Sequence, residues 1–360
     1  MVNGSEAVGL VAAFAVLVVL ISLAVVDARM LPAAPWSRSV LVSLACAATG
    51  VVVWLVVAPL VAPQVVGPLL APIAALAGVA VYLPTIAVRA GGGGALSTIL
   101  YGVCWSALVF VPVAIMTFAL FDADTVLGLA PLDHGGSLAT NVAGGAAALG
   151  VLLANGQNAP RLRTATIGRG MATVGMITLS IGWLGWLAAA ELAIDEATPS
   201  ILLNGVFGAV GGMAGWLVAE RIRKQSTTPN ALAAGLVSGL VAVSAGAPLF
   251  TPISAAVAGV VAGVGAGLFT LVRVQSSRRQ QWFIVGSHLV AGAIGITTLG
   301  VLATGLGYVF TGDTGITWTG VFSFFEREVI STVLAAAYST LVSFVLWSVL
   351  KRTTARAGSA

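Results

Sequence analysis

The sequence is poor in charged residues. Only 8% of its 360 residues are Asp, Glu, Lys or Arg, while 59% are hydrophobic and the mean hydropathy is +1.06. A soluble domain needs more polar surface than this composition supplies, so the sequence predicts a polytopic membrane protein. The formal net charge is +4, but the basic residues form no run or patch, which excludes a nucleic-acid-binding surface.

Cysteine is also scarce. Cys46 and Cys104 both lie in apolar runs, which favours small core residues over a metal or redox site. The glycines at 91–94 follow no strand and precede no Lys-Ser/Thr pair, so they indicate a tight turn rather than a phosphate loop. No paired carboxylates, metal cluster or nucleophile–base arrangement occurs in the apolar runs. We therefore expect neither an enzyme nor a cofactor.

The N-terminal stretch MVNGSEAVGL lacks a basic segment, and no small-residue cleavage site follows it. We therefore expect the first apolar run to be a retained span rather than a cleaved leader. Eleven apolar runs are long enough to cross a bilayer, which takes about 20 residues. They fall at residues 7–26, 40–62, 66–88, 96–120, 138–155, 171–193, 200–220, 230–248, 253–275, 282–304 and 327–350.

The basic residues predict the orientation of these eleven helices. All of them except Arg327 follow odd-numbered spans, and of the acids only Asp27 and Glu220 share that side. Cytoplasmic loops concentrate Lys and Arg, so we expect the N-terminus outside and the C-terminus in the cytoplasm. The basic residues on this side are Arg29, Arg38, Arg89, Arg161, Arg163, Arg169, Arg221, Arg223, Lys224, Arg273, Arg278, Arg279, Lys351, Arg352 and Arg356.

Two spans carry the same short pattern around an unusual polar residue. Asn141 in the fifth span is followed by Gly145-Ala146, and His288 in the tenth by Gly292-Ala293. Small residues at this spacing are also ordinary helix packing. However, the copies are five helices apart along the chain, and an odd offset inverts the second copy relative to the first. Inverted repeats place binding groups near the bilayer midplane.

The sequence therefore predicts one all-α membrane domain over residues 1–360, built from two inverted five-helix repeats and a C-terminal helix. The repeats are expected at 1–160 and 161–305, and the final helix with its short tail at 306–360.

Several motifs in order along the chain resemble the ammonium transporter family (Amt/Mep/Rh). The stretch from Asp133 to Leu149, within PLDHGGSLATNVAGGAAAL, is similar without a gap to the family's DFAGGTVVHINAGVAAL. Further similar stretches are Ser106–Ala114 (SALVFVPVA), Ile181–Ala189 (IGWLGWLAA), the set Asn204, Trp216 and Glu220, the region Gly235–Ser244 after Pro229, and Gly286-Ser287-His288.

The resemblance implies a homotrimer in the plasma membrane of a prokaryote, with one narrow pore per subunit. Aromatic faces would collect ammonium in an outer vestibule, where it would lose its proton, and ammonia would cross past two facing histidines. Carrying the full charge to the bilayer centre would be costly. On this chain the resemblance implies pore-lining residues Asn141 and His288, vestibule residues Phe118, Trp186 and Ala190, and a structural acid at the outer mouth, Asp133.

Each of these residues also has a purely structural interpretation. His288 and Asn141 could be satisfied by hydrogen bonds between helices, and Phe118 and Trp186 could be packing or interface residues. Asp133 could simply cap a helix that starts near Ser137. We expect His134 to be a solvated residue at the mouth.

The sequence departs from the family pattern at the first pore histidine, which is Asn141 here. Asparagine has no proton that titrates at physiological pH, whereas histidine does, so a relay between two histidines cannot operate unchanged. We expect a channel for ammonium, ammonia or a similar small solute. The alternative is a non-conducting member that acts as a sensor or as a structural partner of a transporter.

Overall fold

The computed structural model describes residues 4–27, 36–63, 67–118, 129, 131–156, 169–225, 229–272, 279–307 and 318–357. Part of the charge pattern that predicted the orientation lies outside the described residues, namely Arg29, Arg161, Arg163, Arg273 and Arg278 and the acids Asp122, Asp124 and Asp313.

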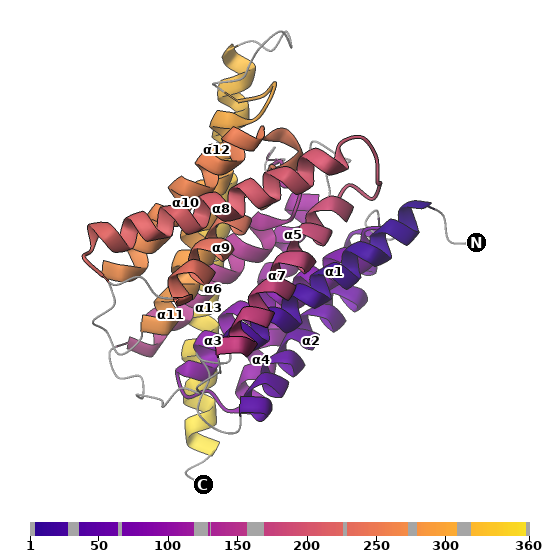
Figure 1. Ribbon diagram of the computed structural model, residues 1–360. Helices are drawn as coiled ribbons and strands as arrows, with labels where there is room; N and C mark the ends of the chain where they lie inside the picture. Colours follow the sequence, from indigo (N-terminus) through magenta and orange to yellow (C-terminus); the bar gives the residue numbers. More distant parts are fainter. Residues whose placement is uncertain are drawn as a thin grey trace.

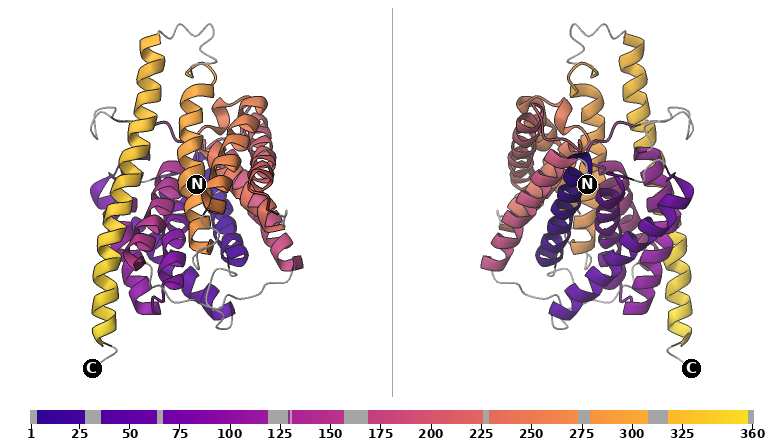
Figure 2. Two further views of the ribbon diagram at one scale, coloured as in Figure 1. Left: turned by 90° about the vertical axis from the view of Figure 1, so that its left-hand side faces the viewer. Right: turned by 90° about the vertical axis from the view of Figure 1, so that its right-hand side faces the viewer.

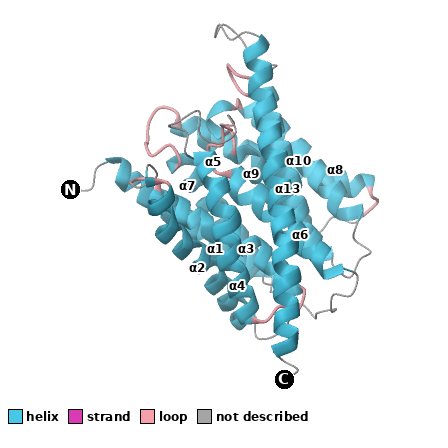
Figure 3. Ribbon diagram, turned by 180° about the vertical axis from the view of Figure 1, so that it is seen from behind, coloured by secondary structure: helices cyan, strands magenta, loops and turns pink. Residues whose placement is uncertain are grey.

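In the described part of the chain the helices form eleven continuous rods joined by loops, with no strand (Figure 3). Nine are long and apolar enough to cross a membrane, and two contain shorter apolar segments, Thr173–Ala189 and Leu232–Ser244. The prediction of an eleven-helix, all-α protein is confirmed. The rods are α1 (Gly4–Asp27), α2 (Trp36–Val61), α3 (Leu70–Ala90), α4–η3–α5 (Ala95–Trp105, Ser106–Phe110, Val111–Phe118), η4–α6 (Leu138–Val142, Ala143–Asn155), α7 (Arg169–Ala189), α8 (Thr198–Ile222), α9 (Pro229–Ser244), α10 (Pro252–Val272), α11–η7–α12 (Arg279–Ile284, Val285–Val290, Ala291–Leu302) and α13 (Trp318–Ala357), with a short 3₁₀ turn η6 (Ala247–Leu249) before α10.

The last helix is much longer than its apolar run. The sequence predicts a span over 327–350, whereas α13 has 40 residues and extends beyond the other helices at both ends (Figure 2). At a rise of about 1.5 Å per residue this is roughly 60 Å, twice the thickness of a hydrocarbon core. The apolar run predicts only the segment of the helix that lies in the hydrocarbon core. The more polar turns before and after that segment are helical as well.

Helix α3 lies at the centre of the first half of the chain. Its residues are buried without interruption from Pro72 to Val88, and it contacts α1, α2, α4 and α6. Figure 1 shows these helices as one group, while α8, α9 and α10 lie together on the other side of the bundle. The central cavity described below lies between the two groups.

Helices α8, α9 and α10 approach one another at glycines. A Cβ atom added to Gly212 of α8 would lie 2.2 Å from the Gly235 carbonyl oxygen of α9, and one added to Gly259 of α10 would lie 2.2 Å from the Gly208 oxygen of α8. No side chain fits at such distances, so the backbones themselves are in contact. Small residues have this role at helix interfaces in membranes, where lipid is as apolar as the protein.

We expect Gly212→Ala to lower the free energy of unfolding by about 1–3 kcal/mol, because the added methyl group overpacks a backbone contact. The measurement is the thermal unfolding midpoint in detergent. Gly170→Ala in α7 is the matched control, since no atom lies within 4 Å of its added Cβ and alanine is the better helix former. A Gly212→Ala protein as stable as the wild type would contradict the contact.

Candidate functional site

Asn141 and His288 meet at the centre of the bundle. The His288 Nδ1 lies 2.9 Å from the Asn141 Oδ1, and the two residues are 3% and 2% exposed. A carbonyl oxygen only accepts hydrogen bonds, so Nδ1 is the ring nitrogen that carries the hydrogen. The two residues predicted to line the pore are therefore in direct contact. This contact is also the hydrogen bond between helices that the purely structural interpretation of Asn141 and His288 requires.

Both residues lie on π-helical turns, Asn141 in η4 and His288 in η7. A π-helical turn inserts an extra residue into an α-helix, which changes the direction of the side chains, and such turns are frequent at functional sites. Thus the two rods are irregular at the same point, where each presents a polar side chain to the other.

The glycines of the repeated pattern contact the opposite rod reciprocally. A Cβ added to Gly145 would lie 2.4 Å from the backbone nitrogen of Leu289, the residue after His288. One added to Gly292 would lie 2.9 Å from a methyl carbon of Val142, the residue after Asn141. Each glycine therefore makes room for the turn that carries the other rod's polar residue, which brings the two residues within hydrogen-bonding distance.

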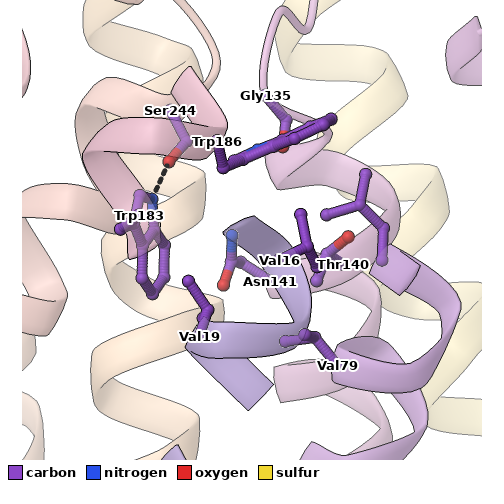
Figure 4. Close-up of a pocket in the computed structure, with 10 residues that line it drawn as sticks. Val16, Val19, Val79, Gly135, Thr140, Asn141, Trp183, Trp186 and Ser244 are labelled. Carbon is purple, nitrogen blue, oxygen red and sulfur yellow. Dashed lines mark hydrogen bonds between the residues drawn. The ribbon is translucent and has the colours of Figure 1, made fainter. Parts of the chain in front are cut away.

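A small cavity, which we call the chamber, lies beside Asn141. Its volume is about 20 Å³, enough for about one water-sized molecule. Apolar walls come from Val16 and Val19 of α1 and from Leu76 and Val79 of α3. The remaining lining residues are Gly135, Thr140, Asn141, Trp183, Trp186 and Ser244 (Figure 4).

Two tryptophans of α7 line the chamber, and both are held in place by hydrogen bonds. The Trp183 Nε1 donates to the Ser244 Oγ at 2.9 Å, and the Trp186 Nε1 donates to the Gly135 carbonyl oxygen at 3.1 Å. In Figure 4 the Trp186 ring lies across the chamber from Asn141. Because both indole N–H groups are paired, neither tryptophan offers a free N–H donor to the chamber.

The loop before η4 is fixed by its acid. The Asp133 carboxylate accepts hydrogen bonds from the backbone N–H groups of Ser137 at 2.7 Å and Leu138 at 2.6 Å. Burial raises the pKa of this carboxyl to about 6, and the backbone N–H groups of Leu138, Ser137 and Gly136 oppose the shift. The capping interaction expected for Asp133 is therefore present. Between these residues, Gly136 has a φ of +68°, which glycine adopts without strain.

The vestibule candidates other than Trp186 are not part of the chamber wall. Phe118 packs against the loop, with its ring 2.7 Å from the position of a Cβ on Gly136. Ala190 lies in the turn directly after α7 and is half-buried. Neither is among the residues that line the chamber.

His134 is not the solvated residue that the sequence suggests. Its Nε2 donates to the Leu187 carbonyl oxygen of α7 at 2.9 Å, and its backbone N–H donates to Ala245 at 2.9 Å. Burial lowers the pKa of its imidazole, and the bond to Leu187 opposes the shift. The sequence-based expectation failed because the segment before η4 folds inward onto α7 and the end of α9.

Several residues near the site did not stand out in the sequence. Trp183, Thr140 and Ser244 line the chamber, and Thr140 directly precedes Asn141. Glu328 of α13 is 1% exposed, and its Oε1 accepts a hydrogen bond from the backbone N–H of Leu132 at 2.6 Å. An acid within an apolar run was the available signal for Glu328, because such residues usually have a specific role.

In the part of the chain that the structure describes, no group of three or more His, Cys, Asp or Glu side chains is placed to hold a metal ion. What the site offers is a small, largely apolar chamber that the Asn141 amide lines, while His288 is not among the lining residues and contacts the site through its hydrogen bond to Asn141. Such a site can pass or hold one small neutral molecule. Among the described residues that line it, no hydroxyl group is hydrogen-bonded to a basic side chain.

Glu328→Leu should lower the free energy of unfolding by about 1–3 kcal/mol, since it leaves the Leu132 N–H buried and unpaired. Glu328→Gln keeps an oxygen acceptor for the Leu132 N–H and carries no charge beside Asp133, so it should be at least as stable as the wild type. Thermal unfolding in detergent measures both. Glu326→Leu on the exposed side of the same helix is the control. If Glu328→Leu and Glu326→Leu unfold at the same temperature, the bond to Leu132 does not hold the loop.

Comparisons with known proteins agree with this fold. The chain is similar to an ammonium transporter of Mycobacterium bovis, 27% identical over 269 residues, which are 71% of this chain and 56% of that protein. It is also similar to an ammonium transporter of Bacillus subtilis, 23% identical over 256 residues, 69% of this chain and 60% of that protein. The matches thus span little more than half the length of these relatives.

Solved structures share the fold over nearly the whole chain. A structure described as a sensor Amt protein has a TM-score of 0.81 at 16% identity, covering 98% of this chain and 94% of its own. The crystal structure of Mep2 from Saccharomyces cerevisiae has a TM-score of 0.77 at 17% identity, covering 95% and 87%.

A profile described as "Ammonium Transporter Family" matches residues 70–357, which is well over half of the chain. This is a family of transporters, in agreement with the expectation of a membrane protein that is not an enzyme. The relation is distant, as the identities to curated members show. On this match, the chain belongs to the ammonium transporter family.

Proposed function

We propose that this protein is a channel that passes ammonia, in its neutral form, between the two sides of the plasma membrane of a prokaryote. The observation that carries the proposal is the contact between Asn141 and His288 beside the chamber. An amide and an imidazole joined in a fixed donor–acceptor direction polarise a passing molecule. They do not exchange a proton, because asparagine has none to give at physiological pH.

The apolar walls of the chamber support a neutral solute. Val16, Val19, Leu76 and Val79 offer an ion no compensating charge, and a cation in hydrocarbon surroundings is strongly disfavoured. Ammonium therefore leaves its proton in the water outside and crosses as ammonia. The cavity of about 20 Å³ admits about one such molecule.

The test uses purified protein in liposomes and compares two signals. An ammonia gradient should change the internal pH faster than in protein-free liposomes, while an ammonium gradient should evoke little current. A robust ammonium current in the wild type would contradict the neutral mechanism. If the pH change is no faster than in protein-free liposomes, the protein does not conduct ammonia.

A non-conducting sensor or structural partner is the second candidate. Two observations favour it: the chamber is small, and Trp186, which lies across it, is held by a hydrogen bond to Gly135. The solved structure with a TM-score of 0.81 is described as a sensor Amt protein. In this case ammonia binds at the chamber but does not cross.

We also propose that the two halves of the chain, residues 1–160 and 161–305, are inverted repeats, followed by the final helix and tail at 306–360. The reciprocal contacts of Gly145 with Leu289 and of Gly292 with Val142 support this symmetry. We propose that the N-terminus lies outside, because the basic residues concentrate on the opposite side, and an odd number of helices then places the C-terminus in the cytoplasm.

Restoring a histidine at position 141 should create a facing pair whose rings titrate together rather than singly. Asn141→His should therefore raise the ammonium-evoked current, or make it more dependent on pH at about pH 6–7, where histidine ordinarily titrates. Current is recorded in liposomes at matched protein amounts, with Asn141→His/His288→Ala as the control that lacks the second ring. A current unchanged by Asn141→His would show that position 141 does not control charge transfer.

The family resemblance implies a homotrimer, and α1 has an apolar face available for subunit contact. The exposed stripe on this helix consists of Leu10, Val11, Phe14, Leu17 and Ile21. We therefore expect a mass of three times the 36.1 kDa chain in a mild detergent, measured by native mass spectrometry. Phe14→Arg should weaken the trimer, because a charge in an apolar contact is unpaired. A monomeric wild type would refute the trimer.

A further inference from the structure

A second cavity, which we call the groove, lies between α6, η7 and α13. Its volume is about 380 Å³, within the range of small-molecule sites and far larger than the chamber of about 20 Å³. Helix α13 runs beside α6 (Figure 3). The leucines Leu149 and Leu153 of α6 and Leu289 of η7 form one wall, and Leu341 and Phe344 belong to the wall that α13 supplies.

The groove is apolar and opens on the outer surface of the bundle. Leu153, Leu341 and Phe344 are 52%, 63% and 41% exposed. The one hydroxyl group among the lining side chains, that of Thr340, donates to the Ala146 carbonyl oxygen at 3.1 Å. The other lining side chains are hydrocarbon. A polar solute would lose its hydrogen bonds in such surroundings, so the groove suits a hydrocarbon chain.

The length of the groove fits one leaflet of a bilayer. Its lining residues on α13 run from Ala336 to Phe344, which is about 12 Å of helix. Half of a hydrocarbon core is about 15 Å thick. The groove therefore extends along most of the depth that a lipid acyl chain occupies.

Two basic residues lie at one end of the groove. Lys351 follows Phe344 by seven residues, which is about two helical turns and places both on the same face of α13. The Lys351 ammonium group donates to the Ala154 carbonyl oxygen, and Ala154 directly follows Leu153 of the groove wall. Arg352 is exposed beside it. The apolar groove thus ends next to two positive charges, as the tail and the phosphate group of a phospholipid require.

We propose that the groove binds one acyl chain of an anionic phospholipid, whose phosphate group lies at Lys351 and Arg352. The chain gains dispersion contacts with three helical elements at once, which a lipid on a convex face does not. Basic residues at a membrane surface attract anionic lipids, so the site discriminates against lipids without net charge. In the proposed orientation the lipid belongs to the cytoplasmic leaflet. The site does not depend on which solute crosses the chamber.

A chain in the groove contacts both rods where they meet. Leu289 directly follows His288, and its backbone nitrogen is the atom that Gly145 approaches. Leu149 lies one turn after Gly145 on the same rod. The bound chain therefore packs against the two segments that the contact of Asn141 with His288 joins.

The test uses the full chain in liposomes with a trace of a phospholipid that carries a photoreactive group in the middle of one acyl chain. One preparation contains photoreactive phosphatidylglycerol, which is anionic, and the other photoreactive phosphatidylcholine, which has no net charge. After illumination, mass spectrometry of the digested protein measures the label on the peptides that contain the groove residues of α6 and α13.

Two kinds of variant remove the two parts of the site. Ala337→Trp fills the groove, since Ala337 is exposed and lines it. Its control is Val345→Trp, at an exposed position of the same helix that does not line the groove. Lys351→Gln/Arg352→Gln removes the charges. The control for this pair is Arg221→Gln/Arg223→Gln, which removes two exposed charges at the C-terminal end of α8.

We expect phosphatidylglycerol to label the groove about fivefold more than phosphatidylcholine does, the factor that corresponds to one favourable charge near a membrane surface. Ala337→Trp and Lys351→Gln/Arg352→Gln should each lower the phosphatidylglycerol label to the level of phosphatidylcholine, and both controls should keep the preference. If Ala337→Trp does not fold, the charge variant decides, because its substitutions lie at the membrane surface.

Equal labelling of the wild-type groove by the two lipids would overturn the proposal. A preference that persists in Lys351→Gln/Arg352→Gln, or in folded Ala337→Trp, would overturn it as well. If neither lipid labels the groove, a protein surface such as a second copy of this chain covers it, and the proposal is wrong.

Discussion

The hydrogen bond between Asn141 and His288 is the interaction on which the rest of the structure depends. Both side chains are buried within a protein of low charge, where no bulk water replaces a lost partner. Separating them would leave a polar group unpaired at a cost of about 1–3 kcal/mol each. The two rods must therefore meet at this point, and Gly145 and Gly292 permit the approach because neither has a side chain.

The remaining contacts of the site serve to keep the chamber small and apolar. Trp183 and Trp186 are each held by a hydrogen bond from the indole nitrogen, so neither indole offers a free N–H donor to the cavity. The loop that supplies Gly135 is fixed through the Asp133 cap and through the bond from Leu132 to Glu328. A rigid chamber of this kind suits a molecule that is neutral and no larger than water.

Much of this arrangement could be predicted from the sequence. The length of each apolar run shows whether it can cross the bilayer, and the positions of the charged residues indicate which loops lie on the same side. The number of helices and the unusual placement of Asn141 and His288 followed in this way. The full length of α13 did not, since its polar ends lack the apolar signal. Contacts that depend on how loops fold back, such as His134 on Leu187 and Glu328 on Leu132, leave no periodic pattern. Thr140 was missed because a threonine in a span is ordinary until the structure places it at the chamber.

The central claim is that the Asn141–His288 pair has a fixed donor–acceptor direction and therefore does not relay protons. Nitrogen-15 NMR of the protein labelled at histidine tests this directly, because the chain has only two histidines, and a His134→Ala sample assigns the signals. The account predicts opposite tautomers: His288 with its hydrogen on Nδ1, facing the Asn141 oxygen, and His134 with its hydrogen on Nε2, facing Leu187. A His288 ring with its hydrogen on Nε2, or one that exchanges between the two forms, would contradict it.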